Sequence, residues 1–132
     1  MGDLPYALVQ VVHNLGAASV VAPPVAAIWL SPDVGPRRRL AWLSTASWAV
    51  QAATGAGFGA VSFFGKGALP EIEGVALSAL SIKVACTVIG LAAGVSLLRR
   101  AAVPAAQTRL WSASLAAGLG ALAGAAFLRW YL

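Results

Sequence analysis

The chain has 132 residues, of which 60% are hydrophobic and only 10% are charged, and its formal net charge is +5 at pH 7. Soluble globular domains have roughly a quarter of their residues charged, and disordered chains combine low hydrophobicity with high charge. The composition therefore excludes both a water-soluble surface and a disordered chain. At this length we expect a single domain, residues 1–132, that lies in a membrane.

Four apolar segments follow one another along the chain, and each is long enough to cross a hydrocarbon core of about 30 Å. We predict helices at about 6–30, 40–64, 75–98 and 110–130. The segments lack the alternation of apolar and polar residues that is typical of membrane strands. Backbone groups in lipid need the internal hydrogen bonds of a helix. The sequence therefore predicts an all-α, integral membrane four-helix bundle with short links.

The first segment also has the position of a signal peptide, and two features argue against that interpretation. No Lys or Arg precedes it, and Pro23 and Pro24 interrupt it, whereas signal peptides begin with positive charge and a short apolar run. The two prolines lack backbone N–H groups and leave the carbonyls of Ser19 and Val20 without their helical donors. We therefore expect a membrane helix with a kink near these prolines.

The basic residues predict the orientation of the bundle rather than a nucleic-acid partner, because they gather in the links between apolar segments. The first and third links together hold six arginines, whereas the other extramembrane segments hold only Lys66 and Arg129. Cytoplasmic links are enriched in Lys and Arg. This asymmetry predicts a multi-pass protein of a bacterial inner (cytoplasmic) membrane with both termini periplasmic. The six arginines are Arg37, Arg38, Arg39, Arg99, Arg100 and Arg109.

Aromatic and small residues predict the packing of the helices. Trp48 lies well inside the second segment and is expected to be a packing residue. The other tryptophans and one tyrosine lie near segment ends, as interfacial aromatics do: Trp29, Trp42, Trp111, Trp130 and Tyr131. Glycines four residues apart allow helices to approach closely in lipid, and three such pairs occur: Gly55/Gly59, Gly90/Gly94 and Gly120/Gly124.

Two ionisable residues of the membrane interior share one predicted level. His13 and Lys83 each lie seven or eight residues from the periplasmic start of their segment, which is about 11–12 Å at the rise of a helix. Polar groups in lipid are costly and are candidates for function. At the same level we expect Thr54, Gly55, Gly57 and Phe58 from the second segment, and Gly118, Gly120 and Leu122 from the fourth.

Three interpretations of His13 and Lys83 remain open. His13 could be an axial ligand of haem b, with Lys83, another subunit or an open position opposite, because the chain has a single histidine. A quinone or lipid head group could instead accept hydrogen bonds from His13 or Lys83. In a structural interpretation, His13 bonds a neighbouring helix and Lys83 extends outward. Cys86, one turn from Lys83, is expected to be a small packing residue.

The pattern resembles the copper-resistance D (CopD)-like four-helix membrane family. The resemblance rests on an early histidine followed by small residues (13–18), on Thr54-Gly55 in the second segment, and on a third segment with Lys83 near its start and Arg99 at its end. It implies haem or copper handling in a bacterial inner membrane. The chain departs from that family by lacking further His and Met residues.

The function expected from the sequence is that of a small membrane subunit of a redox or respiratory-type assembly, which binds haem b or quinone. The expected cofactor-binding residues are His13, Lys83, Gly16, Thr54 and Gly55, with His13 as the possible haem iron ligand. We expect a non-catalytic or electron-transfer subunit rather than an enzyme by itself. Its expected partners are membrane lipids and a larger membrane complex or a second copy. The alternative is an accessory scaffolding subunit that binds only lipid and protein.

Overall fold

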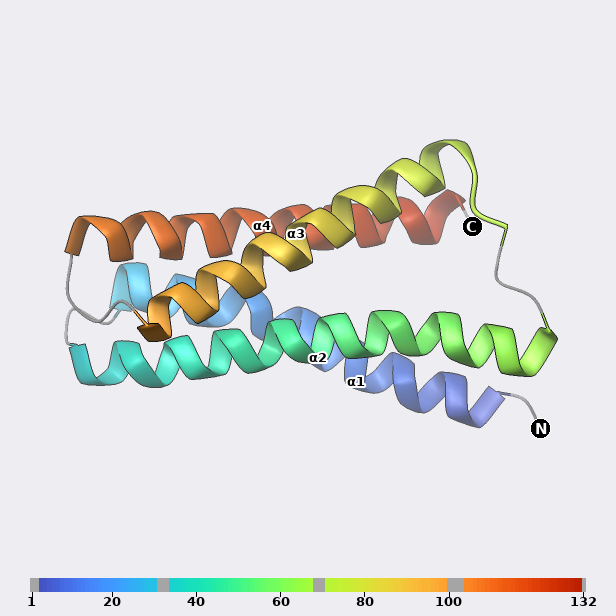
Figure 1. The fold of residues 1–132 in the computed structure, drawn as a ribbon, viewed down its shortest axis with the longest axis horizontal. Coiled ribbons are helices and arrows are strands. Elements are labelled where there is room, and N and C mark those ends of the chain that lie inside the picture. Colours follow the sequence, from blue (N-terminus) through green and yellow to red (C-terminus); the bar gives the residue numbers. More distant parts are fainter. Residues whose placement is uncertain (1–2, 31–33, 68–70, 100–103, 132) are drawn as a thin grey trace.

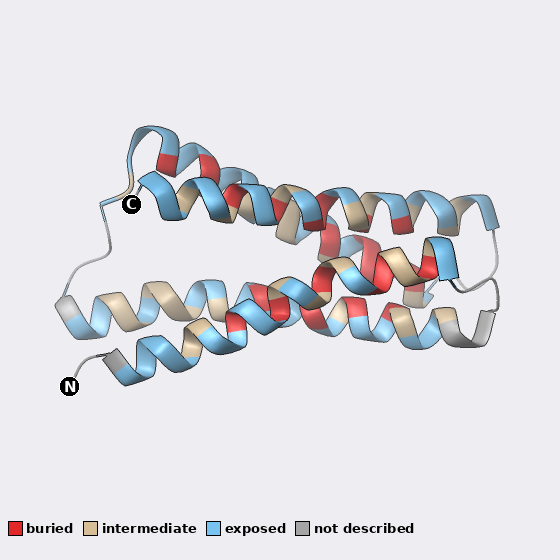
Figure 2. Cartoon of the chain, turned by 180° about the vertical axis from the view of Figure 1, so that it is seen from behind, coloured by how far each residue is buried: buried red, intermediate tan, exposed pale blue. Residues whose placement is uncertain are grey.

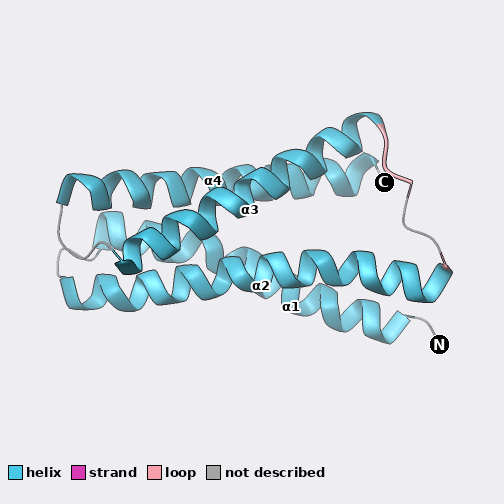
Figure 3. Ribbon diagram, viewed as in Figure 1, coloured by secondary structure: helices cyan, strands magenta, loops and turns pink. Residues whose placement is uncertain are grey.

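The computed structural model describes residues 3–30, 34–67, 71–99 and 104–131, and within these ranges the chain forms four α-helices and no strand (Figures 1 and 3). The expectation of an all-α four-helix fold is confirmed. The helices are α1 (Asp3–Val25), which continues as a π-helical segment (Ala26–Leu30), α2 (Val34–Lys66), α3 (Gly74–Arg99) and α4 (Pro104–Tyr131).

Three of the helices have the length and composition of membrane spans: Leu4–Leu30, Gly74–Arg99 and Pro104–Tyr131. The α2 helix is the longest at 33 residues, but it is less apolar than the other three and does not meet the same criterion. Its hydroxyl and amide side chains, such as Ser44, Ser47 and Gln51, point inward and are buried. The uncharged polar residues of α2 thus lie largely on the face that packs against the other helices.

The helices extend further than the apolar segments from which they were expected. The α2 helix starts at Val34, so Arg37, Arg38 and Arg39 lie in its first turns rather than in a link. The α4 helix likewise starts before Arg109, and Arg100 lies outside the described residues. Arginine side chains at helix ends can reach the interface while the backbone stays helical, which is why charge did not end these helices.

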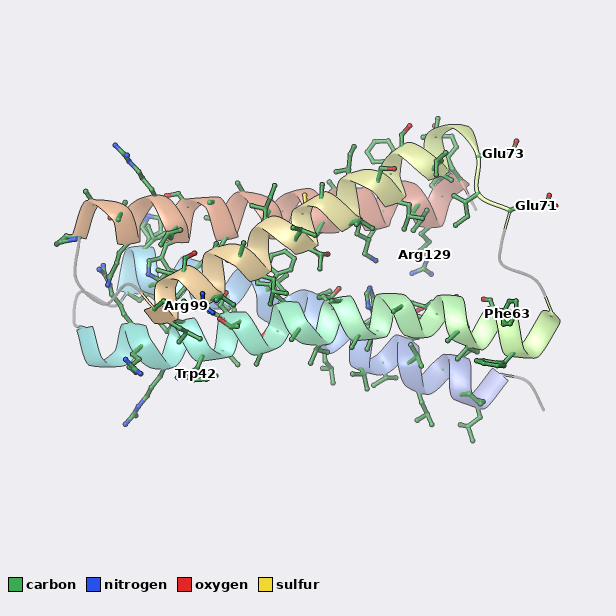
Figure 4. The ribbon with its side chains drawn as sticks, viewed as in Figure 1. Trp42, Phe63, Glu71, Glu73, Arg99 and Arg129 are labelled. Carbon is green, nitrogen blue, oxygen red and sulfur yellow. The ribbon has the colours of Figure 1, made fainter. Side chains whose placement is uncertain are left out.

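The four helices are arranged as two antiparallel pairs (Figure 1). The α1 helix packs mainly against α2, and α3 packs mainly against α4. Both chain ends lie at one end of the molecule, together with the link between α2 and α3, and the other two links lie at the opposite end. The pairs meet in the middle and diverge toward the end that carries the termini. In Figure 4, Glu71 and Glu73 lie at that end, and Trp42 and Arg99 lie at the other.

A glycine ends α2 at the wide end of the bundle. Gly67 has a positive φ of 72°, and its N–H donates to the carbonyl of Phe63 at 2.8 Å. A left-handed residue that closes the last turn in this way is a common helix C-cap, and glycine adopts it without steric cost. The sequence Gly-Lys-Gly after the paired phenylalanines therefore stops the helix where the apolar segment ends.

Buried positions run along the inner faces of the helices and are concentrated where the two pairs cross, whereas the outer faces are exposed (Figure 2). One core cluster contains Val20, Trp48, Ala117 and Ala121. The expectation that Trp48 is a packing residue is confirmed, because its side chain is fully buried. Many large apolar side chains on the outer faces are exposed, as lipid contact requires.

The second core cluster contains a residue that the sequence placed at the interface. Trp111 is only 2% exposed and packs with Ala27, Ala41 and Leu97. By contrast, Trp130 is 84% exposed, and Trp29, Trp42 and Tyr131 are also exposed. Whether a tryptophan near a segment end is buried or exposed depends on the side of the helix on which it lies. On one side it contacts a neighbouring helix, and on the other it contacts lipid.

Close contacts of glycines hold the pairs together. A Cβ atom at Gly90 of α3 would overlap the indole ring of Trp48, and one at Gly94 would lie 2.6 Å from the hydroxyl of Thr45. Gly118 of α4 lies against α1, where a Cβ would be 3.1 Å from Val21 Cγ2. The Gly90/Gly94 pair thus packs helices within the chain, as the small-residue pattern indicated. At Gly55 and Gly59, by contrast, a Cβ would meet no atom within 4 Å.

The two prolines of α1 precede its departure from regular α-helix. Pro23 and Pro24 are both fully buried, and the π-helical segment begins two residues after Pro24. A π-helical turn is a common response to an interrupted hydrogen-bond ladder. The carbonyl of Ala27 in this segment accepts a hydrogen bond from Arg37 Nη2 at 3.3 Å, which ties the end of α1 to the start of α2.

Candidate functional site

His13 lies at the centre of a polar cluster that joins three helices. Its side chain is 6% exposed, so it faces the interior of the bundle and not lipid. Its Nδ1 atom lies 2.7 Å from Thr54 Oγ1 of α2, and its Nε2 atom lies 2.9 Å from Lys83 Nζ of α3. We call these three residues the His13 cluster.

The shared level of His13 and Lys83, which was expected from the sequence, is confirmed by their direct contact. The α1 and α3 helices start at the same end of the bundle (Figure 1). Residues at similar distances from those starts therefore reach the same depth. Lys83 does not simply extend outward: it is half-buried, and among the described residues its ammonium group has His13 as its hydrogen-bond partner.

Gln51 of α2 fixes the position of α1 beside the cluster. Its Nε2 atom donates to the backbone carbonyl of His13 at 2.6 Å. The contact needs a glycine on α1, because a Cβ at Gly16 would lie 2.7 Å from the same Nε2 atom. Gly16, expected as a cofactor-binding residue, therefore makes room for a protein side chain.

Aromatic rings cover one side of the imidazole. The ring of Phe58 meets the ring of His13 edge to face, with centroids 5.2 Å apart. The ring of Tyr6 packs against that of Phe58 in a tilted arrangement, with centroids 5.1 Å apart. Edge-to-face contacts of this kind are favourable and restrict ring orientation. The cluster thus combines strong hydrogen-bonding groups with apolar walls.

The fourth helix meets the cluster at a different residue from those expected. Gly124 of α4 is buried against α3, where a Cβ would lie 3.1 Å from the carbonyl of Ala79 and 3.6 Å from Lys83 Cβ. Gly120 instead faces the thiol of Cys86, Gly118 faces α1, and Leu122 is exposed. The level estimated from the sequence was about one turn off for α4.

Several other candidates lie away from the cluster. Gly55 is exposed, and a Cβ there would meet no atom within 4 Å, so the structure does not bring it to His13. Gln10 and Asn14 bond each other at 2.8 Å on the exposed face of α1. Cys86 is half-buried and packs against the central core cluster, in agreement with a small packing residue.

A second polar network, which the sequence did not reveal, joins α2 to α4. Trp48 Nε1 donates to Ser114 Oγ at 3.3 Å, and Ser44 Oγ lies 3.4 Å from the same oxygen. Both serines are fully buried. Serine hydroxyls are common in membrane helices and are satisfied by their own backbone, so residue type alone gives no signal for such a contact.

The donor set of the cluster does not fit an axial haem ligand. Both imidazole nitrogens are already in short contacts, one with Thr54 and one with Lys83. Iron would have to displace one of these partners to reach the ring. Within the described residues, no three His, Cys, Asp or Glu side chains are grouped as metal ligands. Cys86, the soft donor nearest along α3, packs against Gly120 instead.

Comparisons with known proteins find no relative with which this geometry can be compared. No protein-family model, curated protein or solved structure matches the chain. Arguments about function therefore rest on the residues of the cluster.

Proposed function

We propose that this protein is a small membrane subunit of a redox assembly that binds the carbonyl head of a quinone at the His13 cluster. The observation that carries the proposal is the contact of 2.9 Å between Lys83 Nζ and His13 Nε2 inside a bundle of membrane-type helices. Placing a polar pair inside a membrane costs free energy, and such pairs are typical of functional sites. The contact supports a site for a small polar group with an apolar body.

The residues of the cluster suit a carbonyl oxygen. A lysine ammonium group has three N–H donors and no acceptor, and the contact with His13 uses one of them. The remaining donors can bind an oxygen that only accepts. Phe58 and the exposed apolar faces of α1 and α3 provide surfaces for a ring and an isoprenoid tail. A bound quinone would supply two-electron, two-proton redox chemistry, and Lys83 would hold a proton at its carbonyl.

Quinone binding can be measured with the protein in nanodiscs and decylubiquinone as the probe. We expect saturable binding above the partition into empty nanodiscs. Lys83→Met should weaken it at least about tenfold, because a hydrogen bond to a charged group contributes about 1.5–3 kcal/mol. Ser81→Ala is the matched control, since this exposed α3 hydroxyl bonds only the carbonyl of Leu77 in its own helix.

Two results would contradict the proposal. If the wild-type protein binds no more quinone than empty nanodiscs do, the accessory scaffolding function, with lipid and protein as partners, takes its place. If Lys83→Met binds as tightly as Ser81→Ala, a quinone site exists elsewhere and the His13 cluster does not form it.

We also propose that the protein lies in a bacterial inner membrane with both termini periplasmic, inside a larger complex or a homo-oligomer. The arginines in the first turns of α2 and at the end of α3 support this orientation, because Lys and Arg favour the cytoplasmic side. The links between the helices are short, which leaves little surface outside the membrane for independent activity.

Orientation can be tested with single cysteines in a Cys86→Ala background. We expect an impermeant maleimide to label Glu71→Cys in intact cells and to label Arg38→Cys only after the membrane is opened. Both side chains are exposed, so access depends on the side of the membrane. The reverse pattern would place the arginine-rich end outside.

A further inference from the structure

The hydroxyl group of Thr54 takes part in two short contacts with only one proton to share. Thr54 Oγ1 lies 2.6 Å from the carbonyl oxygen of Val50, one turn earlier in α2, and 2.7 Å from His13 Nδ1. The carbonyl can only accept. The hydroxyl must therefore donate to Val50 and accept from His13, or else two lone pairs face each other at one of these distances.

The contact with Val50 decides which nitrogen of the imidazole carries the proton. If the hydroxyl donates to Val50, His13 Nδ1 must be the N–H group, and Nε2 is then a bare acceptor. The other tautomer would need the hydroxyl proton at Nδ1 and would leave the carbonyl of Val50 facing an oxygen lone pair at 2.6 Å.

The contact on the opposite side of the ring favours the same tautomer. Lys83 Nζ faces Nε2 at 2.9 Å, and an ammonium group only donates. A proton on Nε2 would place donor against donor at that distance. A doubly protonated imidazole would add a second cation beside Lys83, in a part of the chain where no described acidic side chain contacts either residue.

We infer that Thr54 is a positioning residue that holds His13 as the Nδ1–H tautomer, so that Nε2 accepts from Lys83. All hydrogen bonds then run in one direction: Lys83 donates to His13, His13 donates to Thr54, and Thr54 donates to Val50. The last acceptor is a backbone carbonyl, which does not carry a proton onward. The His13 cluster therefore holds a proton at Lys83 and does not conduct one through α2.

One consequence rests on the proposed function. In a quinone site, this direction leaves Lys83 rather than His13 as the hydrogen-bond donor to the ligand, because His13 Nδ1–H is used by Thr54. The tautomer itself needs no ligand, so it can be tested whether or not a quinone binds.

The chain has a single histidine, which makes the test direct. Protein labelled with ¹⁵N-histidine gives NMR signals from one imidazole, and their shifts separate protonated from bare ring nitrogens. At neutral pH and without added quinone, we expect a protonated Nδ1 and a bare Nε2. A wild-type spectrum with a protonated Nε2 would overturn the inference without any variant.

Substitutions at Thr54 test whether its hydroxyl group sets the tautomer of His13. Thr54→Val keeps the shape of the side chain and removes the acceptor of Nδ1–H. Because Lys83 by itself also favours a bare Nε2, the variant is made in the Lys83→Met background, where we expect the Nε2–H tautomer to become a substantial fraction of the ¹⁵N signal. Thr54→Ser restores a hydroxyl and should restore the wild-type spectrum. Thr108→Val in the same background is the matched control, because Thr108 makes the same kind of bond within α4, to the carbonyl of Pro104 at 3.1 Å, and its side chain is exposed.

Helix content by circular dichroism confirms that each variant is folded before its spectrum is read. In the Lys83→Met background, a Thr54→Val spectrum identical to that of Thr108→Val would show that Thr54 does not set the tautomer. If the wild-type protein shows the expected tautomer but binds no quinone, only the proposed function is contradicted.

Discussion

Gly90→Ala is expected to destabilise the protein by about 3 kcal/mol, an upper value for overpacking of a core. The added Cβ would overlap the indole ring of Trp48. That ring is fully buried and donates to Ser114, so it cannot move aside without breaking the network between α2 and α4. Either α3 must move away from α2, or the ring must leave its place. Unfolding by denaturing detergent, followed by circular dichroism, measures the loss.

Gly55→Ala is the matched control for this prediction. Gly55 lies in a helix as Gly90 does, but a Cβ there meets no atom within 4 Å. Alanine is the better helix former by about 1 kcal/mol, so this variant should be at least as stable as the wild type. In the Gly90→Ala background, Trp48→Leu should recover part of the loss by making room. Equal stability of the two alanine variants would show that α2 and α3 do not approach as described.

His13→Leu is expected to lower the free energy of unfolding by about 2 kcal/mol, a value within the range for a lost hydrogen bond to a charged group. The substitution keeps an apolar volume beside Phe58 and leaves the ammonium group of Lys83 without its described partner. Lys83→Met should cost only about 1 kcal/mol, because a neutral imidazole nitrogen without a donor is less costly than an unpaired charge in a membrane.

The double variant His13→Leu/Lys83→Met tests whether His13 and Lys83 stabilise the protein through their contact with each other or independently. Buried polar pairs can often be replaced together by apolar residues at little cost, so we expect its stability to lie within about 1 kcal/mol of the wild type. The same unfolding measurement applies, with Ser81→Ala as a control outside the cluster. If the two single losses simply add, Lys83 does not depend on His13 for its place in the membrane.

Part of the candidate site could be predicted because depth in a membrane is a one-dimensional property. The distance of a residue from its helix start gives its level through the rise per residue. This placed His13 and Lys83 together, and the structure joins them at 2.9 Å. The same reasoning was less successful for α4, where Gly124 rather than Gly120 lies beside Lys83. The rise per residue gives a level only along the axis of one helix, and α3 runs obliquely to α4 (Figure 1).

The sequence by itself determined the four helices, the membrane character of the chain and the shared level of its two ionisable interior residues. Only the tertiary structure decided which side of each helix faces inward: it turned Thr54 and Gln51 toward His13, turned Gly55 outward, and buried Trp111. The reason is physical. In a soluble protein the apolar side of a helix marks the core, but in lipid both the outer and the inner side are apolar. Rotation and register are then set by close contacts between small residues such as Gly90 and the partners that fit them, and those partners are known only once the helices are packed.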